Sequence, residues 1–205
     1  MNKIDFLSQK TDELQQSGLT TGQIADELNI STETVIWLLT NKKQSPDGIV
    51  PKDISVNWSS LGQNATRLRC TAQILCDMVL EISVAEKEYI DVIVGVSSSG
   101  VPVASFMAGE MDSEFTVYYS KKIKFDIGTT ESKGAFSRNF SEVNGKNCVI
   151  VDDVISSGRT LTDVIAQTKA AGGNPIAVAV LVDKVGFDEI DGVPVVAMMR
   201  IARLG

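Results

Sequence analysis

Hydrophobic residues over the first forty positions recur every three or four residues, a spacing typical of short amphipathic helices. The pair Ser17–Gly18 ends the first of them. Thr20, followed three positions later by Gln23, forms a capping-box pattern at the start of a second. Asn29 tolerates the left-handed conformation of a turn, and Ser31 can cap a third helix. The sequence therefore predicts three short helices in this head.

The head resembles a helix-turn-helix, a motif whose second helix reads DNA from the major groove. Ala25 is a small residue at the point where two helices would cross, and Asn29, four positions later, replaces the more usual glycine. Apolar residues at the remaining motif positions would face the core: Ile24, Leu28, Ile30, Val35 and Leu38. The residues expected at DNA bases and phosphates are Ser31, Thr32, Glu33, Ile36, Trp37, Thr40, Asn41, Lys42 and Lys43.

The net charge of the head leaves open an alternative to DNA binding. Residues 1–53 contain five lysines, no arginine and eight acidic residues, a net charge of −3, whereas most DNA-binding modules are basic. Trp37 could equally be a core residue. The alternative is a three-helix cap that only packs on the larger domain.

A polar stretch separates the head from the rest of the chain. Residues 41–53 carry Ser45–Gly48, which includes a proline, and then Pro51, a composition typical of turns and domain boundaries. We therefore predict a helix-turn-helix domain at 1–44, a linker at 45–53 and a larger domain at 54–205.

Unbroken apolar, β-branched runs replace the helical spacing in the larger domain, as is typical of buried parallel strands. These runs are Ile90–Val96, Phe115–Tyr119, Cys148–Val151, Ile176–Val182 and Val193–Arg203, the last including a tail. Helical patterns begin at Ser60 and at Arg159. The alternation predicts an α/β fold in which helices flank a parallel sheet.

A loop after the strand Cys148–Val151 carries the strongest candidate chemistry. Ligands of open parallel sheets bind beyond the carboxyl ends of the strands, and free amides at the start of the following helix favour a phosphate. Carboxylates repel phosphate but suit ribose hydroxyls or a Mg²⁺ ion. We therefore predict a site for a phosphorylated sugar, with an ordinary β-α unit whose acidic pair caps a helix as the alternative. The expected residues are Asp152, Asp153, Ile155, Ser156, Ser157, Gly158, Arg159 and Thr160.

A second small-residue loop follows the strand Ile90–Val96 and precedes a helix start at Val101–Pro102, where proline is well tolerated. This arrangement again places free amides at a helix N-terminus and predicts a second anion site. Its residues are Ser97, Ser98, Ser99 and Gly100.

Both loops resemble motifs of one enzyme family. Val149–Thr160 is similar to the phosphoribosyl pyrophosphate (PRPP) signature of type I phosphoribosyltransferases, and Val94–Pro102 is similar to their pyrophosphate loop. The resemblance covers roughly residues 54–205 and implies the type I phosphoribosyltransferase fold. It also implies that a nucleobase would be held near Asp183 and Lys184.

The loop that closes over pyrophosphate in orotate phosphoribosyltransferases carries an arginine, two lysines and a histidine. Lys121 and Lys124 match the spacing of the two lysines and are the candidate catalytic residues. Ser120 stands at the arginine position, and the chain contains no histidine. The resemblance therefore leaves catalytic competence in doubt, although the lysines could still neutralise a phosphate.

Charge, cysteine content and hydropathy exclude several classes of protein and of binding site. The net charge of −7 argues against indiscriminate nucleic-acid binding, and three cysteines without metal-ligand spacing disfavour zinc sites and disulfide frameworks. No apolar run is long enough to span a membrane and no signal-peptide pattern is present, so we expect a cytoplasmic protein. No tightly bound cofactor is expected, only Mg²⁺ held with a pyrophosphate by Asp152 and Asp153.

Two functions follow from these features. One is an orotate or other nucleobase phosphoribosyltransferase with an accessory head. The other is a transcription regulator that senses a phosphorylated sugar such as PRPP, and the head and the incomplete catalytic loop favour it. The arrangement resembles the archaeal PyrE-like regulators known as GfcR, which control central sugar catabolism genes. That resemblance implies an operator-binding homodimer.

Overall fold

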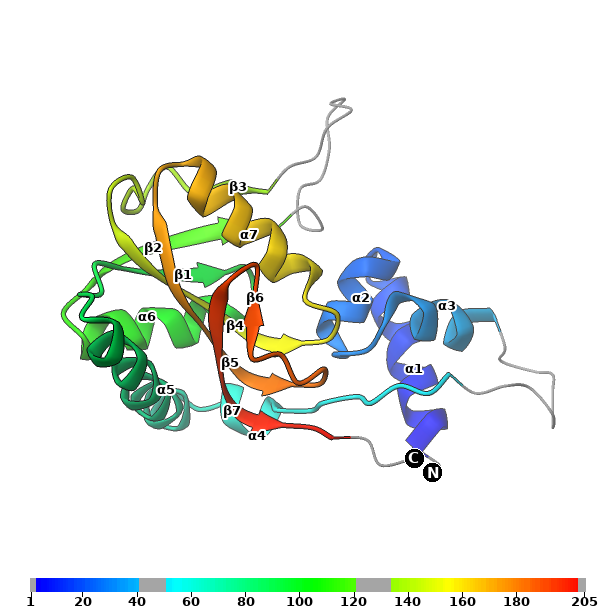
Figure 1. The fold of residues 1–205 in the computed structure, drawn as a ribbon. Coiled ribbons are helices and arrows are strands. Elements are labelled where there is room, and N and C mark those ends of the chain that lie inside the picture. The colour runs from blue at the N-terminus through cyan, green and yellow to red at the C-terminus, as the bar shows by residue number, and fades with distance from the viewer. Residues whose placement is uncertain (1–2, 41–50, 121–133, 203–205) are drawn as a thin grey trace. The chain divides into compact units, whose positions relative to one another are not determined.

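The computed structural model describes residues 3–40, 51–120 and 134–202 (Figure 1). The chain divides into two compact units, Met1–Trp58 and Ser59–Gly205, each of which is described by itself below. The expected linker at 45–53 lies largely outside the described residues.

Three helices form the first unit as predicted: α1 (Lys3–Gln16), α2 (Thr21–Glu27) and α3 (Thr32–Thr40). Thr20 and Gln23 make both hydrogen bonds of the capping box at the start of α2. Asn29 has the expected left-handed conformation, with φ of 50°, and the Ser31 hydroxyl accepts the Thr34 N–H at 3.1 Å. The predicted apolar residues meet in one small core: Ile24, Ala25, Ile30, Val35 and Leu38.

The residues that follow the head's undescribed stretch are hydrogen-bonded to α3 and to the turn between α2 and α3. The Asp53 carboxylate accepts the Ser31 N–H at 2.6 Å and the Thr34 hydroxyl at 2.9 Å. The Asn29 side chain donates to the carbonyl of Val56 at 3.1 Å. Residues 51–58 therefore fold with the head, and the second unit begins at Ser59.

A seven-stranded sheet forms the centre of the second unit (Figure 1). Its strands are β1 (Val92–Val96), β2 (Glu114–Tyr119), β3 (Ala135–Phe136), β4 (Asn147–Ile155), β5 (Asn174–Asp183), β6 (Glu189–Ile190) and β7 (Val193–Arg200). The order across the sheet is β3-β2-β1-β4-β5-β7-β6. The five long strands are parallel, as predicted, whereas β3 and β6 pair antiparallel at the two edges, so the sheet is mixed.

Helices cover both faces of this sheet. Helices α5 (Ala65–Glu86), α6 (Gly100–Glu110) and α7 (Arg159–Ala170) contact its strands, and the short α4 (Ser59–Gly62) contacts α5. The helix expected from Ser60 is interrupted after Gly62, and Asn64 caps the start of α5 by accepting the Arg67 N–H at 3.1 Å.

Alternate residues of the central strands serve the two faces, because successive side chains of a strand point in opposite directions. Val94 and Ile150 join the core cluster that contains Val164 and Ile165 of α7. On the other face α6 packs very closely on β1, and a Cβ atom on Gly95 would lie 3.0 Å from that of Ala104. Both faces of the sheet are therefore buried, which explains the unbroken apolar runs of the sequence.

Candidate functional site

The candidate site is the edge of the sheet where β1, β4 and β5 end. These strands are parallel neighbours, with Gly95 paired to Val151 and Ile155 paired to Asp183. Their carboxyl ends therefore meet at one edge, and so do the loops that follow them. The structure thus brings together the two loops that the sequence predicts as anion sites, and it adds a third loop at 184–188.

Gly100 puts the first loop in direct contact with the acidic pair. A Cβ atom at this position would lie 2.3 Å from the carbonyl oxygen of Val151 and 2.8 Å from the Cα atom of Asp152. Only a glycine lets the start of α6 approach β4 this closely. Gly100 is buried, whereas Ser97 and Ser99 are half-buried and Ser98 is exposed.

The acidic pair lies inside β4, which corrects the expectation that this strand ends at Val151. The pairing with β5 continues through Val154 and Ile155, whose apolar side chains extend the strand beyond the two carboxylates. Asp152 and Asp153 are consecutive strand residues and so point to opposite faces. Asp153 is buried, with 8% exposure, and Asp152 is half-buried and accepts the Asp153 N–H at 2.9 Å.

The second loop leads directly into α7. Gly158 is the N-cap residue, with a left-handed φ of 77°, and no side chain caps this helix. The first amides of α7 therefore have no intrahelical acceptor, which is the condition that favours an anion. The other predicted residues of the loop differ in exposure: Ser156, Ser157 and Arg159 are exposed, Thr160 is half-buried and Ile155 is buried.

Asp183 organises the third loop, a role that the sequence analysis did not assign. Its fully buried carboxylate accepts the backbone N–H groups of Val185, Gly186 and Phe187 at 2.8, 2.9 and 2.7 Å. A Cβ atom on Gly158 would lie 3.0 Å from the Phe187 ring, so the second and third loops touch. An aspartate at the end of a predicted strand with Gly186 three positions later is the signal that could have indicated this turn.

Arg200 holds the same loop from β7. Its guanidinium pairs with the Asp188 carboxylate at 2.7 Å and donates to the carbonyl of Phe187 at 3.0 Å. The loop is thus anchored from two strands.

Tyr118 is a further residue that sequence reasoning missed. Its backbone carbonyl accepts the N–H of Ser97 at 2.8 Å, and its hydroxyl donates to the Asp163 carboxylate of α7 at 2.7 Å. Burial, and secondly the hydrogen bond to Asp163, raises the pKa of the Tyr118 hydroxyl well above its usual value. Its ring lies edge-on to Phe136, with centroids 5.2 Å apart. Tyr118 therefore links the first loop, the helix of the second loop and strand β3.

Lys121 and Lys124 lie outside the described residues, so their expected place over a phosphate stays a prediction. Ser120, at the position of the family's arginine, is buried.

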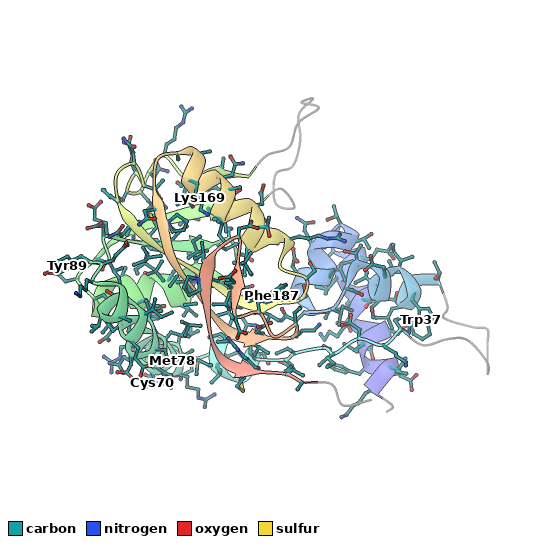
Figure 2. The ribbon with its side chains drawn as sticks, in the orientation of Figure 1. Trp37, Cys70, Met78, Tyr89, Lys169 and Phe187 are labelled. Carbon is teal, nitrogen blue, oxygen red and sulfur yellow. The ribbon has the colours of Figure 1, made fainter. Side chains whose placement is uncertain are left out.

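The predicted DNA-facing residues of α3 divide by exposure. Glu33, Ile36 and Thr40 are exposed, whereas Thr32 and Ser31 are half-buried. Trp37, labelled in Figure 2, is half-buried and packs against the head's apolar core. Asn41, Lys42 and Lys43 lie outside the described residues.

Comparison with known proteins places both the fold and the family. The model of the phosphoribosyl transferase domain matches residues 67–186. An adenine phosphoribosyltransferase from Rhodothermus marinus is similar in structure, with a TM-score of 0.56 at 20% identity over 78% of this chain and 93% of that one. For an orotate phosphoribosyltransferase from Aeropyrum pernix the TM-score is 0.55 at 16% identity, over 89% and 94%. The second unit therefore has the type I phosphoribosyltransferase fold.

Relatives that match this chain over its full length are more similar in sequence than these solved structures are. The chain is 53% identical to Transcriptional regulator GfcR 1 of Methanosarcina barkeri and 41% identical to Transcriptional regulator GfcR of Archaeoglobus fulgidus. Both alignments cover 100% of this chain and of the relative. The chain belongs to the GfcR family of transcriptional regulators. Among the helices that the structure describes, none has the length and apolar character needed to cross a membrane.

Proposed function

We propose that this protein is a cytoplasmic, DNA-binding transcriptional regulator of central sugar catabolism genes, whose phosphoribosyltransferase-like unit senses a phosphorylated sugar such as PRPP. The observation that carries the ligand part is the contact of Gly100 with Val151 and Asp152, which holds two helix N-termini beside one acidic pair. The regulator part is supported by the names of the full-length relatives.

The proposed ligand is elongated and carries an anion at each end. The start of α7 would receive a sugar phosphate, since its amides are uncapped by any side chain. The start of α6, also without a side-chain cap, would receive the pyrophosphate. Asp152 would accept hydrogen bonds from the ribose hydroxyls between the two loops, and Lys121 and Lys124 would neutralise phosphate charge.

Magnesium would accompany a pyrophosphate ligand in this proposal. The Asp152 and Asp153 carboxylates both carry the oxygen atoms that Mg²⁺ prefers, but Asp153 is buried and points to the opposite face of β4, so Asp152 would be the carboxylate that reaches the ion. The described residues contain no group of three histidine, cysteine or acidic side chains that could hold a metal ion. The ion would therefore need oxygen atoms of the pyrophosphate as well, and it would supply charge neutralisation between the two loops.

DNA recognition would fall to α3, with Glu33, Ile36 and Thr40 exposed for bases and Lys42 and Lys43 close to phosphates. A homodimer would present two heads to a palindromic operator. The ligand would change DNA affinity only to the extent that it binds the two conformational states of the protein with different affinity.

A nucleobase phosphoribosyltransferase is the second candidate, favoured by the fold and by the survival of both anion loops. Transfer chemistry of this kind depends on electrostatic stabilisation of the departing pyrophosphate. The chain lacks any histidine and carries Ser120 in place of the loop arginine, so this stabilisation would be incomplete.

The experiment that separates the candidates measures binding to the DNA upstream of the protein's own gene, with and without PRPP, alongside turnover of orotate. We expect sequence-specific binding that PRPP alters, and no turnover. Turnover without specific DNA binding would establish the enzyme instead. Specific DNA binding that PRPP does not change would support the regulator function and would exclude PRPP as its effector.

A further inference from the structure

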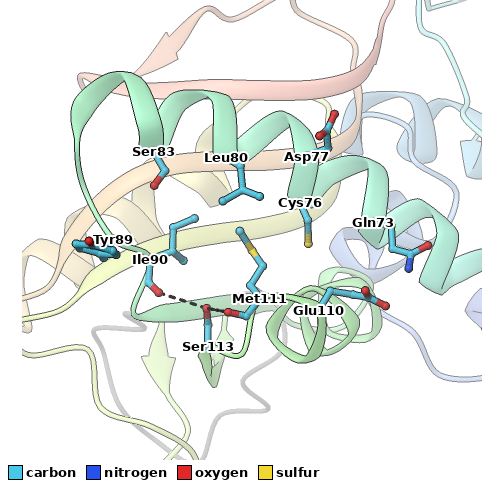
Figure 3. A pocket seen from close by; sticks show the side chains of 10 residues that line it. All are labelled: Gln73, Cys76, Asp77, Leu80, Ser83, Tyr89, Ile90, Glu110, Met111 and Ser113. Carbon is cyan, nitrogen blue, oxygen red and sulfur yellow. Dashed lines mark hydrogen bonds between the residues drawn. The ribbon is translucent and has the colours of Figure 1, made fainter.

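A groove lies at the edge of the second unit opposite the candidate ligand site. Its volume is about 590 Å³, and α5 forms one wall (Figure 3). The other wall comes from the end of α6 and the residues after it, together with Tyr89 and Ile90 immediately before β1. These residues stand at the amino ends of the parallel strands, whereas the predicted anion loops stand at the carboxyl ends.

The floor of the groove is apolar. Figure 3 shows Cys76 and Leu80 pointing from α5 towards Met111 and Ile90. Leu80 is 45% exposed and Tyr89, at the end of the groove, is 87% exposed. Burial raises the pKa of the Cys76 thiol to about 11, so this side chain is neutral at physiological pH. An occupant could therefore bury apolar surface here.

The rim carries negative charge. Asp77 and Glu110 line the groove from α5 and α6, and both are exposed. Within the described ranges, neither carboxylate forms a hydrogen bond or an ion pair with another residue. Glu81 and Asp112, one turn and two residues further along, are exposed as well and add to the same field.

Electrostatics restricts what can fill the groove. Nucleic acid and phosphate would be repelled by its carboxylates. A second copy bound through the same groove would bring two acidic rims together, because a two-fold interface uses the same patch on both copies. An occupant with positive charge and some apolar surface is complementary to both the rim and the floor.

We propose that the groove is a docking site for a basic amphipathic segment of a partner protein. An apolar side chain of that segment would rest on Leu80 and Met111, and its lysine or arginine side chains would pair with Asp77 and Glu110. Because the ligand loops occupy the opposite edge of the sheet, partner and sugar could be bound together. The groove belongs to the second unit, and the proposal does not depend on the proposed function.

The test selects peptides that bind the full-length protein from a random library. A displayed library of random peptides is enriched on the wild-type protein and depleted on the variant Asp77→Asn with Glu110→Gln. The affinities of the enriched peptides are then measured by fluorescence anisotropy. A matched control changes two exposed carboxylates outside the groove, Glu142→Gln with Glu189→Gln.

We expect the enriched peptides to carry net positive charge and at least one large apolar residue. Losing two exposed ion pairs should weaken their binding roughly tenfold in the groove variant, and Leu80→Ser should also weaken it, whereas the control should bind normally.

Several results would overturn the proposal. Enrichment of neutral or acidic peptides would mean that the groove does not select a basic segment. Peptide binding that is weakened equally in the control variant would mean the same. Binding of spermine as tight as that of the best peptides would assign the groove to a small cation. A change in the sedimenting mass of the groove variant would assign it to a second copy of the chain.

Discussion

Tyr118 links three segments of the candidate site at the scale of a single residue, and its hydroxyl donates a hydrogen bond to the Asp163 carboxylate. Removing that hydroxyl in Tyr118→Phe takes away a hydrogen bond to a charged group. We expect the free energy of unfolding to fall by about 1–2 kcal/mol, less than for a fully buried pair because Asp163 is half-buried. Urea unfolding followed by circular dichroism measures this. Tyr119→Phe, at the exposed neighbour, is the matched control and should change little.

The raised pKa of Tyr118 also sets a pH dependence. The folded protein holds the phenolic proton more tightly than the unfolded chain does. The resulting contribution to stability is therefore complete below the unfolded pKa of about 10 and is lost as the pH rises above it. The free energy of unfolding should decline less steeply above that pH in Tyr118→Phe than in the wild type. Equal slopes would show that Tyr118 ionises normally in the folded state.

Asp183 provides a second test at this scale. An asparagine has one acceptor oxygen, so Asp183→Asn cannot accept all three N–H groups of the 184–188 loop. We expect a loss of about 2–3 kcal/mol in unfolding free energy. Asp188→Asn, which breaks only the exposed pair with Arg200, should cost at most about 1 kcal/mol. Similar losses in the two variants would contradict the role given to Asp183.

Helix α6 offers a matched pair of glycines at the scale of an element. The added methyl group of Gly100→Ala would collide with the backbone of β4, so the start of α6 must move away from Asp152. Gly109 lies near the end of the same helix with no atom within 4 Å of an added Cβ, and Gly109→Ala should be neutral or stabilising by up to about 1 kcal/mol. We expect Gly100→Ala alone to lose PRPP affinity in calorimetric titrations. Normal PRPP binding by this variant would show that PRPP binding does not require the close approach of α6 to β4.

The elements also show which features the sequence could reveal. Unbroken apolar runs located the five long strands because both faces of the sheet are buried. The end of β4 was misplaced because Asp152 and Asp153 interrupt its apolar run, although Val154 and Ile155 continue the pairing. Strands β3 and β6 have two residues each, too few for a periodic pattern. The partner of Tyr118 lies 45 positions away on another element, and local pattern cannot predict such a contact.

At the scale of the whole molecule, the proposed regulator must couple two sites that belong to different units. Thermodynamic linkage then requires reciprocity: the factor by which PRPP changes the dissociation constant for operator DNA equals the factor by which the operator changes that for PRPP. Titrating each ligand in the presence and absence of the other measures both factors. We expect them to agree, and to lie in the range of about fivefold to 150-fold.

Two double variants locate the coupling. The double variant Asp152→Asn with Asp153→Asn should lose PRPP binding, so that neither ligand changes the dissociation constant of the other. It should keep its basal operator affinity, because the acidic pair lies in the second unit. Thr32→Ala with Lys42→Ala should weaken operator binding and leave PRPP affinity unchanged. Retained PRPP affinity in the first variant would contradict the ligand site, and retained operator affinity in the second would favour a head that only packs. Unequal factors in the wild type would mean that one of the two titrations does not report binding at the proposed site, so the reciprocity measurement tests the regulator as a single system.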